Sequence, residues 1–289
     1  MENKPREIVI VSGKGGTGKT TLAINLSTIV KDKLIIDCDV DAPNMHILLK
    51  PEILREEKFF GGYRYKIDGE KCVGCGVCYD VCNFDAVVKK EEKYEINEIN
   101  CDYCGVCHHF CEYDAIEKEE RLSGYFYLSK TRFGDFLHAN LIPGEENSGR
   151  LVAKIRAVGR KLFSDKKYFL IDGPPGIGCS VISAITGTDL VVVVCEPTVS
   201  SIHDLKRILD LASHFKIRSA VVINKFNINS SLTGEIENFC GERDIKVVGK
   251  IPFSPHIVES LKILKTLKEY GSDLLKNYEE IWYNISSLI

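Results

Sequence analysis

Short runs of apolar, mostly β-branched residues recur along the chain of 289 residues, and each run ends at a polar or small residue. The runs occupy residues 7–12, 34–37, 168–172, 190–195 and 220–224. Nearly continuous apolar runs are typical of strands that are buried on both faces of a parallel sheet. Segments with helical character, such as residues 20–30 and 201–214, separate these runs. The pattern predicts an α/β fold with a mostly parallel, doubly wound sheet between two layers of helices.

The segment 125–150 interrupts this pattern, because it is polar and rich in glycine. We expect it to lie outside the core, at a dimer or partner surface. The last stretch, residues 274–289, has amphipathic helical spacing and offers Trp282 for packing. It carries Glu279 and Glu280 and few cations, so we predict a core helix rather than a membrane-binding helix. No apolar run approaches the roughly 18 residues of a membrane-spanning helix, and we expect no membrane partner.

A glycine-rich loop joins the first predicted strand to the first predicted helix. Its residues are Gly13, Lys14, Gly15, Gly16, Thr17, Gly18, Lys19 and Thr20, followed by Thr21. They match G-x-x-x-x-G-K-[ST] in the strand–loop–helix context that this phosphate-binding motif requires. Glycines let the backbone wrap a phosphate, so that its N–H groups and the helix N-terminus face the anion. We predict that Lys19 contacts the β- and γ-phosphates of a nucleotide and that Thr20 binds Mg²⁺.

Eight of the twelve cysteines form two runs with identical spacing, offset by 29 residues. Each run reads C-x2-C-x2-C-x3-C, the spacing of bacterial ferredoxins, in which the fourth cysteine binds the other cluster. The predicted ligand sets for two [4Fe-4S] clusters are Cys72, Cys75, Cys78 and Cys111, and Cys101, Cys104, Cys107 and Cys82. Residues 83–87 and 112–116 also match each other, which indicates an internal duplication. Asn83 and Glu112 replace the proline that usually follows the fourth cysteine.

Other uses of these cysteines are less consistent with the spacing. A structural zinc site needs four ligands and leaves a third cysteine of each run unused. A disulfide framework needs an oxidising compartment, and the N-terminus does not resemble a signal peptide. We therefore expect a cytoplasmic location. Residues 62–120 carry 7 Lys/Arg against 14 Asp/Glu, which disfavours nucleic acid and favours a partner protein with a basic docking patch.

The phosphate loop resembles the deviant Walker A motif, K-G-G-T-G-K-T, of the MinD/Mrp/ParA ATPases and the nitrogenase iron protein. The resemblance implies ATP as the nucleotide. It also implies that Lys14 reaches the nucleotide of a second subunit, so that the protein is a homodimer with ATP at the interface. Residues 37–44, D-C-D-V-D-A-P-N, look like switch I of this family. By that resemblance, Asp39 lies near Mg²⁺ and the attacking water, and acts in catalysis with Lys14 and Lys19.

Further segments extend the resemblance toward the C-terminus. Residues 168–176 end in D-G-P-P-G, similar to switch II of Mrp-type members, with Asp172 holding Mg²⁺ through water and Pro175 and Gly176 in the turn that senses the γ-phosphate. Helix capping after a strand is the alternative role for Asp39 or Asp172. The family contacts adenine at positions that match Asn224 and Pro252.

Four cysteines lie outside the two runs. We expect Cys38, Cys195 and Cys240 to be packed in the core. Cys179 follows Asp172 by seven residues, the offset at which the nitrogenase iron protein places a cluster-bridging cysteine. The resemblance implies a further metal or redox site there, and a small packed thiol is the alternative.

The expected organisation is a P-loop ATPase domain in two parts, residues 1–61 and 121–289, and an inserted α+β ferredoxin-like domain at residues 62–120. The insert lies between the two switches, so we predict a Mg²⁺-dependent ATPase that gates electron transfer through two [4Fe-4S] clusters to a partner protein. Two alternatives stay open. One is an ATPase that assembles or carries an iron–sulfur or other metal cofactor for a client protein. The other is a MinD/ParA-like positioning ATPase whose clusters sense redox state.

Overall fold

The structure is a computed structural model that describes residues 4–289. The strands are β1 (Arg6–Ser12), β2 (Lys33–Asp37), β3 (Glu52–Ile67), β4 (Val87–Lys90), β5 (Lys93–Ile96), β6 (Ile116–Thr131), β7 (Gly134–Leu141), β8 (Tyr168–Pro175), β9 (Leu190–Cys195), β10 (Ser219–Asn224) and β11 (Lys246–Ile251). The helices are α1 (Lys19–Ser27), α2 (Met45–Leu49), α3 (Val77–Asp80), α4 (Val106–His109), α5 (Ser148–Leu162), α6 (Cys179–Ile185), α7 (Val199–His214), the 3₁₀ turn η1 (Phe226–Ile228), α8 (Ser230–Glu242), α9 (Pro255–Lys262), α10 (Leu267–Tyr270) and α11 (Leu275–Ser286).

The chain divides into two compact units. One unit comprises the residues up to Glu57 together with Tyr125–Ile289, and the other comprises Lys58–Gly124. Both limits fall inside long strands, β3 and β6, rather than in loops. The boundary expected at Gly61-Gly62 therefore lies within a strand, where the Gly61 N–H donates a hydrogen bond to the Ser123 hydroxyl.

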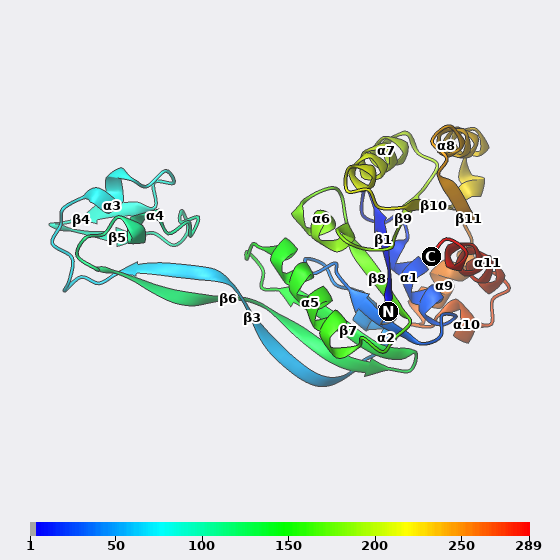
Figure 1. Ribbon diagram of the computed structural model, residues 1–289, viewed down its shortest axis with the longest axis horizontal. Coiled ribbons are helices and arrows are strands. Elements are labelled where there is room, and N and C mark those ends of the chain that lie inside the picture. The colour runs from blue at the N-terminus through cyan, green and yellow to red at the C-terminus, as the bar shows by residue number, and fades with distance from the viewer. Residues whose placement is uncertain (1–3) are drawn as a thin grey trace. The chain divides into compact units, whose positions relative to one another are not determined.

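The larger unit is built on a sheet with the order β11-β10-β9-β1-β8-β2-β7-β6-β3. The pairings from β11 to β7 are parallel, as the apolar runs predict. Successive residues of these strands are buried on opposite faces: Ile35 packs in the core cluster with α1 and α11, whereas Leu34 and Ile36 lie against α5. Figure 1 shows helices on both faces of this sheet, with α5, α6 and α7 on one side and α1 and α11 on the other. The predicted α/β fold is thus confirmed for this unit.

The expectation for residues 125–150 was wrong. Residues 125–141 contain the end of β6 and all of β7, and β7 pairs with β2 inside the sheet. Phe136 and Leu137 are completely buried. The polar residues misled the prediction because several of them are satisfied inside the protein. The Ser129 hydroxyl and His138 Nε2, for example, are 3.1 Å apart and both side chains are buried.

The C-terminal helix α11 packs against the sheet, as its amphipathic spacing predicts. Tyr278, Ile281 and Ile285 are buried in the core cluster that also contains residues of β1, β8 and β9. Trp282 meets the ring of Tyr168 edge to face, with 5.0 Å between the ring centroids. The prediction of a core helix is confirmed.

The smaller unit contains two similar halves. Gly74, Gly76 and Asp85 have left-handed backbone angles, and so do Tyr103, Gly105 and Asp114, which lie 29 residues further along. Each half thus repeats the same turns before and after a one-turn helix, α3 or α4. The antiparallel hairpin β4–β5 links the halves. This repeated backbone supports the internal duplication inferred from the cysteine spacing.

Candidate nucleotide-binding site

The polar residues that were predicted to bind nucleotide lie where parallel strands end. β1 leads into the phosphate loop, β2 leads into the loop that contains Asp39, and Asp172 lies in β8. In the register of the sheet, Asp37 at the end of β2 is aligned with Asp172. Open parallel sheets bind ligands at the carboxyl ends of their strands. The strand order therefore brings three distant segments to one edge.

The phosphate loop needs glycine at two positions for identifiable reasons. Gly18 has φ +96°, and a Cβ there would come within 2.4 Å of Asn224 Nδ2. A Cβ on Gly13 would lie 2.0 Å from Cβ of Asp204 in α7. A side chain at either position would collide with its neighbour, so glycine lets the loop pack closely against Asn224 and α7.

A cavity of about 500 Å³ opens beside this loop. It is lined by Gly15, Gly16, Gly18, Lys19, Thr20, Thr21, Asp39, Asp41, Ala42, Asn44, Pro174, Pro175 and Ser180. The structure thus brings together the predicted phosphate loop, the predicted switch I residue Asp39 and the predicted switch II residue Pro175. Ser180 was not anticipated from the sequence, since a serine in the first turn of a helix is most often a capping group.

Lys19 and Asp39 are both buried at the cavity wall, with 5% and 8% of their surface exposed. Burial raises the pKa of Asp39. The charge of Lys19 opposes this shift, and the neighbouring Asp41 adds to it. A carboxylate with a raised pKa is better suited to accept a proton near neutral pH than an ordinary aspartate.

Asp172 is fully buried, and within residues 4–289 neither of its carboxylate oxygens has a hydrogen-bond partner of normal geometry. Burial raises the pKa of Asp172, and the nearby Asp39 raises it further. The charge of Lys19 and the nearby Thr20 hydroxyl act in the opposite direction and lower this pKa. Leaving a buried carboxylate unpaired is costly, so the group is expected to interact with a cation. Mg²⁺ binds oxygen ligands and retains several waters. Thr20 and Asp172 therefore fit the predicted Mg²⁺ site.

Asp37 has a role that the sequence did not reveal. Its carboxylate accepts hydrogen bonds from the backbone N–H groups of Asp39, at 3.0 Å, and Met45, at 3.3 Å. Burial and the neighbouring Asp172 raise the pKa of Asp37. The side chain thus holds both ends of the loop that carries Asp39.

Several predicted residues lie behind the cavity rather than on its wall. Asn224 donates a hydrogen bond of 2.7 Å to the Thr17 carbonyl and accepts one of 2.9 Å from the Lys225 N–H. Its amide therefore supports the phosphate loop. Gly176 has φ +91°, and its N–H donates to the Ser12 carbonyl at 2.8 Å. Pro252 is not among the lining residues, and its predicted contact with adenine stays a prediction.

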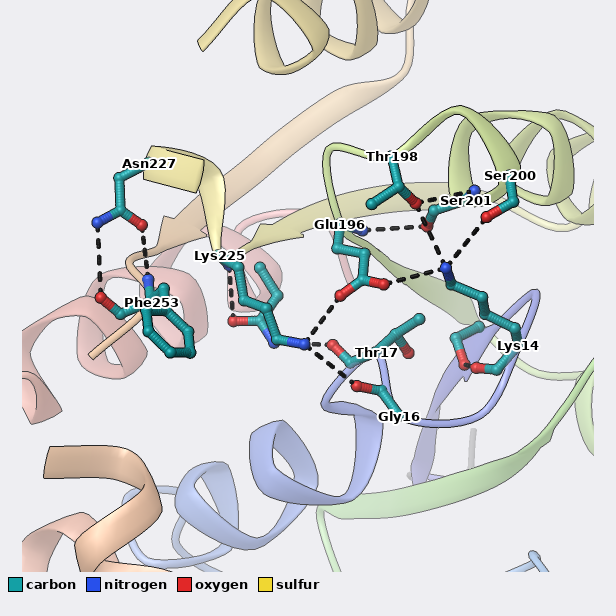
Figure 2. Close-up of polar contacts among 12 residues, drawn as sticks. Lys14, Gly16, Thr17, Glu196, Thr198, Ser200, Ser201, Lys225, Asn227 and Phe253 are labelled. Carbon is teal, nitrogen blue, oxygen red and sulfur yellow. Dashed lines mark hydrogen bonds and ion pairs between the residues drawn. The ribbon is translucent and has the colours of Figure 1, made fainter. Parts of the chain in front are cut away.

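Lys14 also lies outside the cavity wall. Its ammonium forms a 3.0 Å ion pair with Glu196 and hydrogen bonds with the hydroxyls of Thr198 and Ser200 (Figure 2). All three partners belong to the same chain. Its predicted contact with the nucleotide of a second subunit requires these interactions to break.

In the smaller unit, the eight cysteines line two separate small pockets of about 20 Å³ each. One pocket is lined by Cys72, Cys75, Cys78 and Cys111, and the other by Cys82, Cys101, Cys104 and Cys107. Each pocket thus combines three cysteines of one run with the fourth cysteine of the other. Within residues 4–289, no group of three or more His, Cys, Asp or Glu side chains is placed so that it could hold a metal ion.

The thiols of these pockets differ in their surroundings. Burial raises the pKa of Cys78 and Cys101, and it raises the pKa of Cys107 to about 11. Burial also raises the pKa of Cys82, but hydrogen bonds from the backbone N–H groups of residues 84, 86 and 87 outweigh it, and the net shift is downward. Backbone N–H groups directed at a sulfur stabilise its thiolate form.

Three of the four remaining cysteines are buried in the core as predicted, and the fourth is exposed. Cys38, Cys195 and Cys240 are buried, which confirms that prediction. Cys179 is exposed at the first position of α6. The packed-thiol alternative does not fit this exposure, and the predicted metal or redox role of Cys179 stays a prediction.

Comparison with known proteins identifies the family. The CobQ/CobB/MinD/ParA nucleotide binding domain matches residues 8–266. The chain belongs to this family. An uncharacterized protein of Methanocaldococcus jannaschii is 31% identical over 98% of this chain and 97% of its own length.

MinD proteins are among the further relatives of this chain. The septum site-determining protein MinD of Helicobacter pylori is 24% identical over 95% of this chain and 88% of that protein. The structure of the septum site-determining protein MinD of Pyrococcus horikoshii, complexed with Mg-ADP, has a TM-score of 0.59 and 16% identity and covers 98% of this chain and 97% of that one. The resemblance to MinD/ParA ATPases in fold is confirmed. In the part of the chain that the structure describes, no helix is both long and apolar enough to cross a membrane.

The contact between Asn224 and the phosphate loop can be tested by Asn224→Ala. The substitution removes the hydrogen bond to the Thr17 carbonyl and leaves the loop less fixed, at a cost of about 1 to 2 kcal/mol. We expect the affinity for Mg-ATP to fall about fivefold to thirtyfold in isothermal titration calorimetry. Asn238→Ala, at an exposed position of α8, is the control and should bind as the wild type does. Equal affinity of Asn224→Ala and wild type would contradict the support that we assign to Asn224.

Proposed function

We propose that this chain is a Mg²⁺-dependent ATPase that changes between a monomer and a dimer with ATP at the interface. The observation that carries this proposal is the cavity in which Lys19, Thr20 and Asp39 meet at the ends of parallel strands. Membership of the CobQ/CobB/MinD/ParA family supports it. The Mg-ADP in the Pyrococcus horikoshii MinD structure indicates the same class of ligand.

The proposed reaction is transfer of the γ-phosphoryl group to water. The water oxygen bonds to phosphorus, the bond from phosphorus to the bridging oxygen breaks, and ADP leaves with that electron pair. Lys19 and the N–H groups of the loop neutralise the charge of the phosphates. Asp39 orients the water and accepts its proton, for which its raised pKa is suited. Thr20 and Asp172 would hold Mg²⁺, which would supply further neutralisation of the phosphate oxygens.

Among the possible functions of this ATPase cycle, nucleotide-dependent positioning of a partner protein is the best supported. The sequence led us to expect gated electron transfer as the main function. The named relatives among the comparisons above are septum site-determining proteins, and they favour the positioning alternative. In this interpretation the ATP-bound dimer presents a surface to a partner protein, and hydrolysis ends that contact.

Gated electron transfer remains a second candidate because of the cysteine pockets. In a [4Fe-4S] cluster each cysteine binds a different iron, so four sulfurs around a pocket suit it even where none converge on a single ion. Both predicted ligand sets, including the exchange of the fourth cysteine, line a pocket of their own. A chain with two such clusters would also suit the carrier alternative, in which a cluster is passed to a client protein.

Dimerisation tests the proposed function. We expect Mg-ATP, but not Mg-ADP, to convert the wild type from monomer to dimer in analytical ultracentrifugation. Lys19→Ala should lose about 100-fold or more in ATP affinity, because it removes the cation at the phosphates. Lys14→Ala should bind ATP and stay monomeric. Lys31→Ala, at an exposed position after α1, is a charge-matched control. A wild type that stays monomeric in saturating Mg-ATP, or a Lys14→Ala variant that dimerises normally, would count against the proposal.

Metal content tests the second candidate. Anaerobically purified wild type should contain about eight irons per chain, as two [4Fe-4S] clusters require. Cys111→Ser should lose about four irons together with the signals of the cluster held by Cys72, Cys75 and Cys78 in electron paramagnetic resonance. Cys240→Ser, at a buried position of α8 outside the two runs, is the matched control and should retain about eight irons. Zinc in place of iron, or a loss in Cys111→Ser that spans both clusters equally, would argue against these ligand sets.

A further inference from the structure

Glu196 lies between two lysines at the back of the phosphate loop. Its Oε1 is 3.0 Å from Nζ of Lys14, and its Oε2 is 2.9 Å from Nζ of Lys225. Figure 2 shows the carboxylate between the two ammonium groups, which arrive from the phosphate loop and from the end of β10. The three residues are separated by long stretches of sequence, so the arrangement is a product of the fold.

The ion pairs are partly shielded from water. The Glu196 side chain is 15% exposed, and those of Lys14 and Lys225 are 34% and 30% exposed. Burial raises the pKa of Glu196, but the hydrogen bonds and charges of Lys225 and Lys14 outweigh it, and the net shift is downward. The carboxylate is therefore ionised at neutral pH and attracts both lysines.

The hydrogen-bonding capacity of Lys14 is fully used within its own chain. An ammonium group has three N–H donors. The Lys14 ammonium has three acceptors: the Glu196 carboxylate, the Thr198 hydroxyl at 3.3 Å and the Ser200 hydroxyl at 3.1 Å. These acceptors lie within one short segment at the start of α7. Lys14 therefore has no donor available for a phosphate unless it leaves this segment.

The backbone on both sides of the ion pair is fixed. The Glu196 N–H donates to the hydroxyl of Ser201, which is buried in the first turn of α7. The carbonyl of Lys14 accepts a hydrogen bond of 2.7 Å from Ser12. Because the backbone is held, a change in the partner of Lys14 can occur through its side chain alone.

Lys225 lets Glu196 release Lys14 at lower cost. An acceptor left unpaired at a partly buried position pays its full desolvation penalty. Lys225 stays bonded to Glu196 Oε2 when Lys14 departs, and its own N–H is held by Asn224. The carboxylate then keeps one cation, so the exchange leaves no unpaired charge behind.

We propose that Glu196 is a positioning residue that retains Lys14 in its own subunit until the phosphates of a partner-bound ATP compete for it, with Lys225 as the cation that keeps Glu196 paired afterwards. This inference rests on the proposed ATP-dependent dimer. It implies a threshold ATP concentration for dimer formation, because association must overcome the attraction of Glu196 for Lys14. The segment 196–200 thus sets the ATP concentration at which dimers form.

Two substitutions should shift that concentration in opposite directions. Glu196→Gln removes the competing charge and should lower the ATP concentration at half-maximal dimerisation about threefold to tenfold, as expected for a partly shielded ion pair. Lys225→Met leaves Lys14 as the principal cation for Glu196 and should raise that concentration by a similar factor. Asp210→Asn in α7, which removes an exposed ion pair with Arg243 at the end of α8, is the control and should leave this concentration unchanged.

The measurement is sedimentation velocity over an ATP titration with each intact variant, alongside melting temperatures that report folding. A structural role would lower the melting temperature and shift both variants in the same direction. The double variant Glu196→Gln with Lys14→Ala should behave as Lys14→Ala alone, because the effect of Glu196 passes through Lys14. An unchanged or raised half-maximal concentration in Glu196→Gln, with normal wild-type dimerisation, overturns the inference. A wild type that does not dimerise with ATP overturns the proposed function as well.

Discussion

The unpaired, buried carboxylate of Asp172 is the group on which the rest of the site depends. It lies in a central strand beside Asp37, so two acidic side chains share one buried edge of the sheet. Burial raises the pKa of both. The neighbouring Asp172 raises the pKa of Asp37 further, and Asp39 raises the pKa of Asp172 further. Asp37 is compensated by two backbone N–H groups, whereas Asp172 has no such partner in residues 4–289. A folded chain retains such a group when a ligand provides the missing interaction.

The arrangement of the phosphate loop follows from the same edge. Gly13 lies against α7, Gly18 lies against Asn224, and the Thr17 carbonyl is bonded by that asparagine. The loop is thus shaped by contacts with β10 and α7. Preorganised N–H groups bind an anion without paying to order the backbone. Lys19, at the start of α1, lies close enough to Asp172 in β8 for its charge to lower the pKa of that carboxylate.

The sequence was sufficient to predict features that are formed by neighbouring residues. The strand–loop–helix of the phosphate loop and the apolar parallel strands each depend on residues close together in the chain. It failed for β7, because polar residues such as His138 are satisfied by partners that only the fold supplies. It also failed for Glu196, whose contacts with Lys14 join positions 182 residues apart. The roles of Asp37 and Asn224 were missed for the same reason, since a hydrogen bond to a backbone group leaves no pattern in the sequence.

The central claim is that Asp172 holds Mg²⁺ together with the nucleotide. The most direct measurement is the Mg²⁺ dependence of ATP binding by Asp172→Asn, followed by titration calorimetry, with the thermal stability of the free protein measured in parallel. Our account predicts that the asparagine variant loses most of the increase in ATP affinity that Mg²⁺ produces in the wild type. It also predicts that the variant is at least as stable without ligand, because a buried carboxylate has been removed. An unchanged Mg²⁺ dependence in this variant would contradict the account.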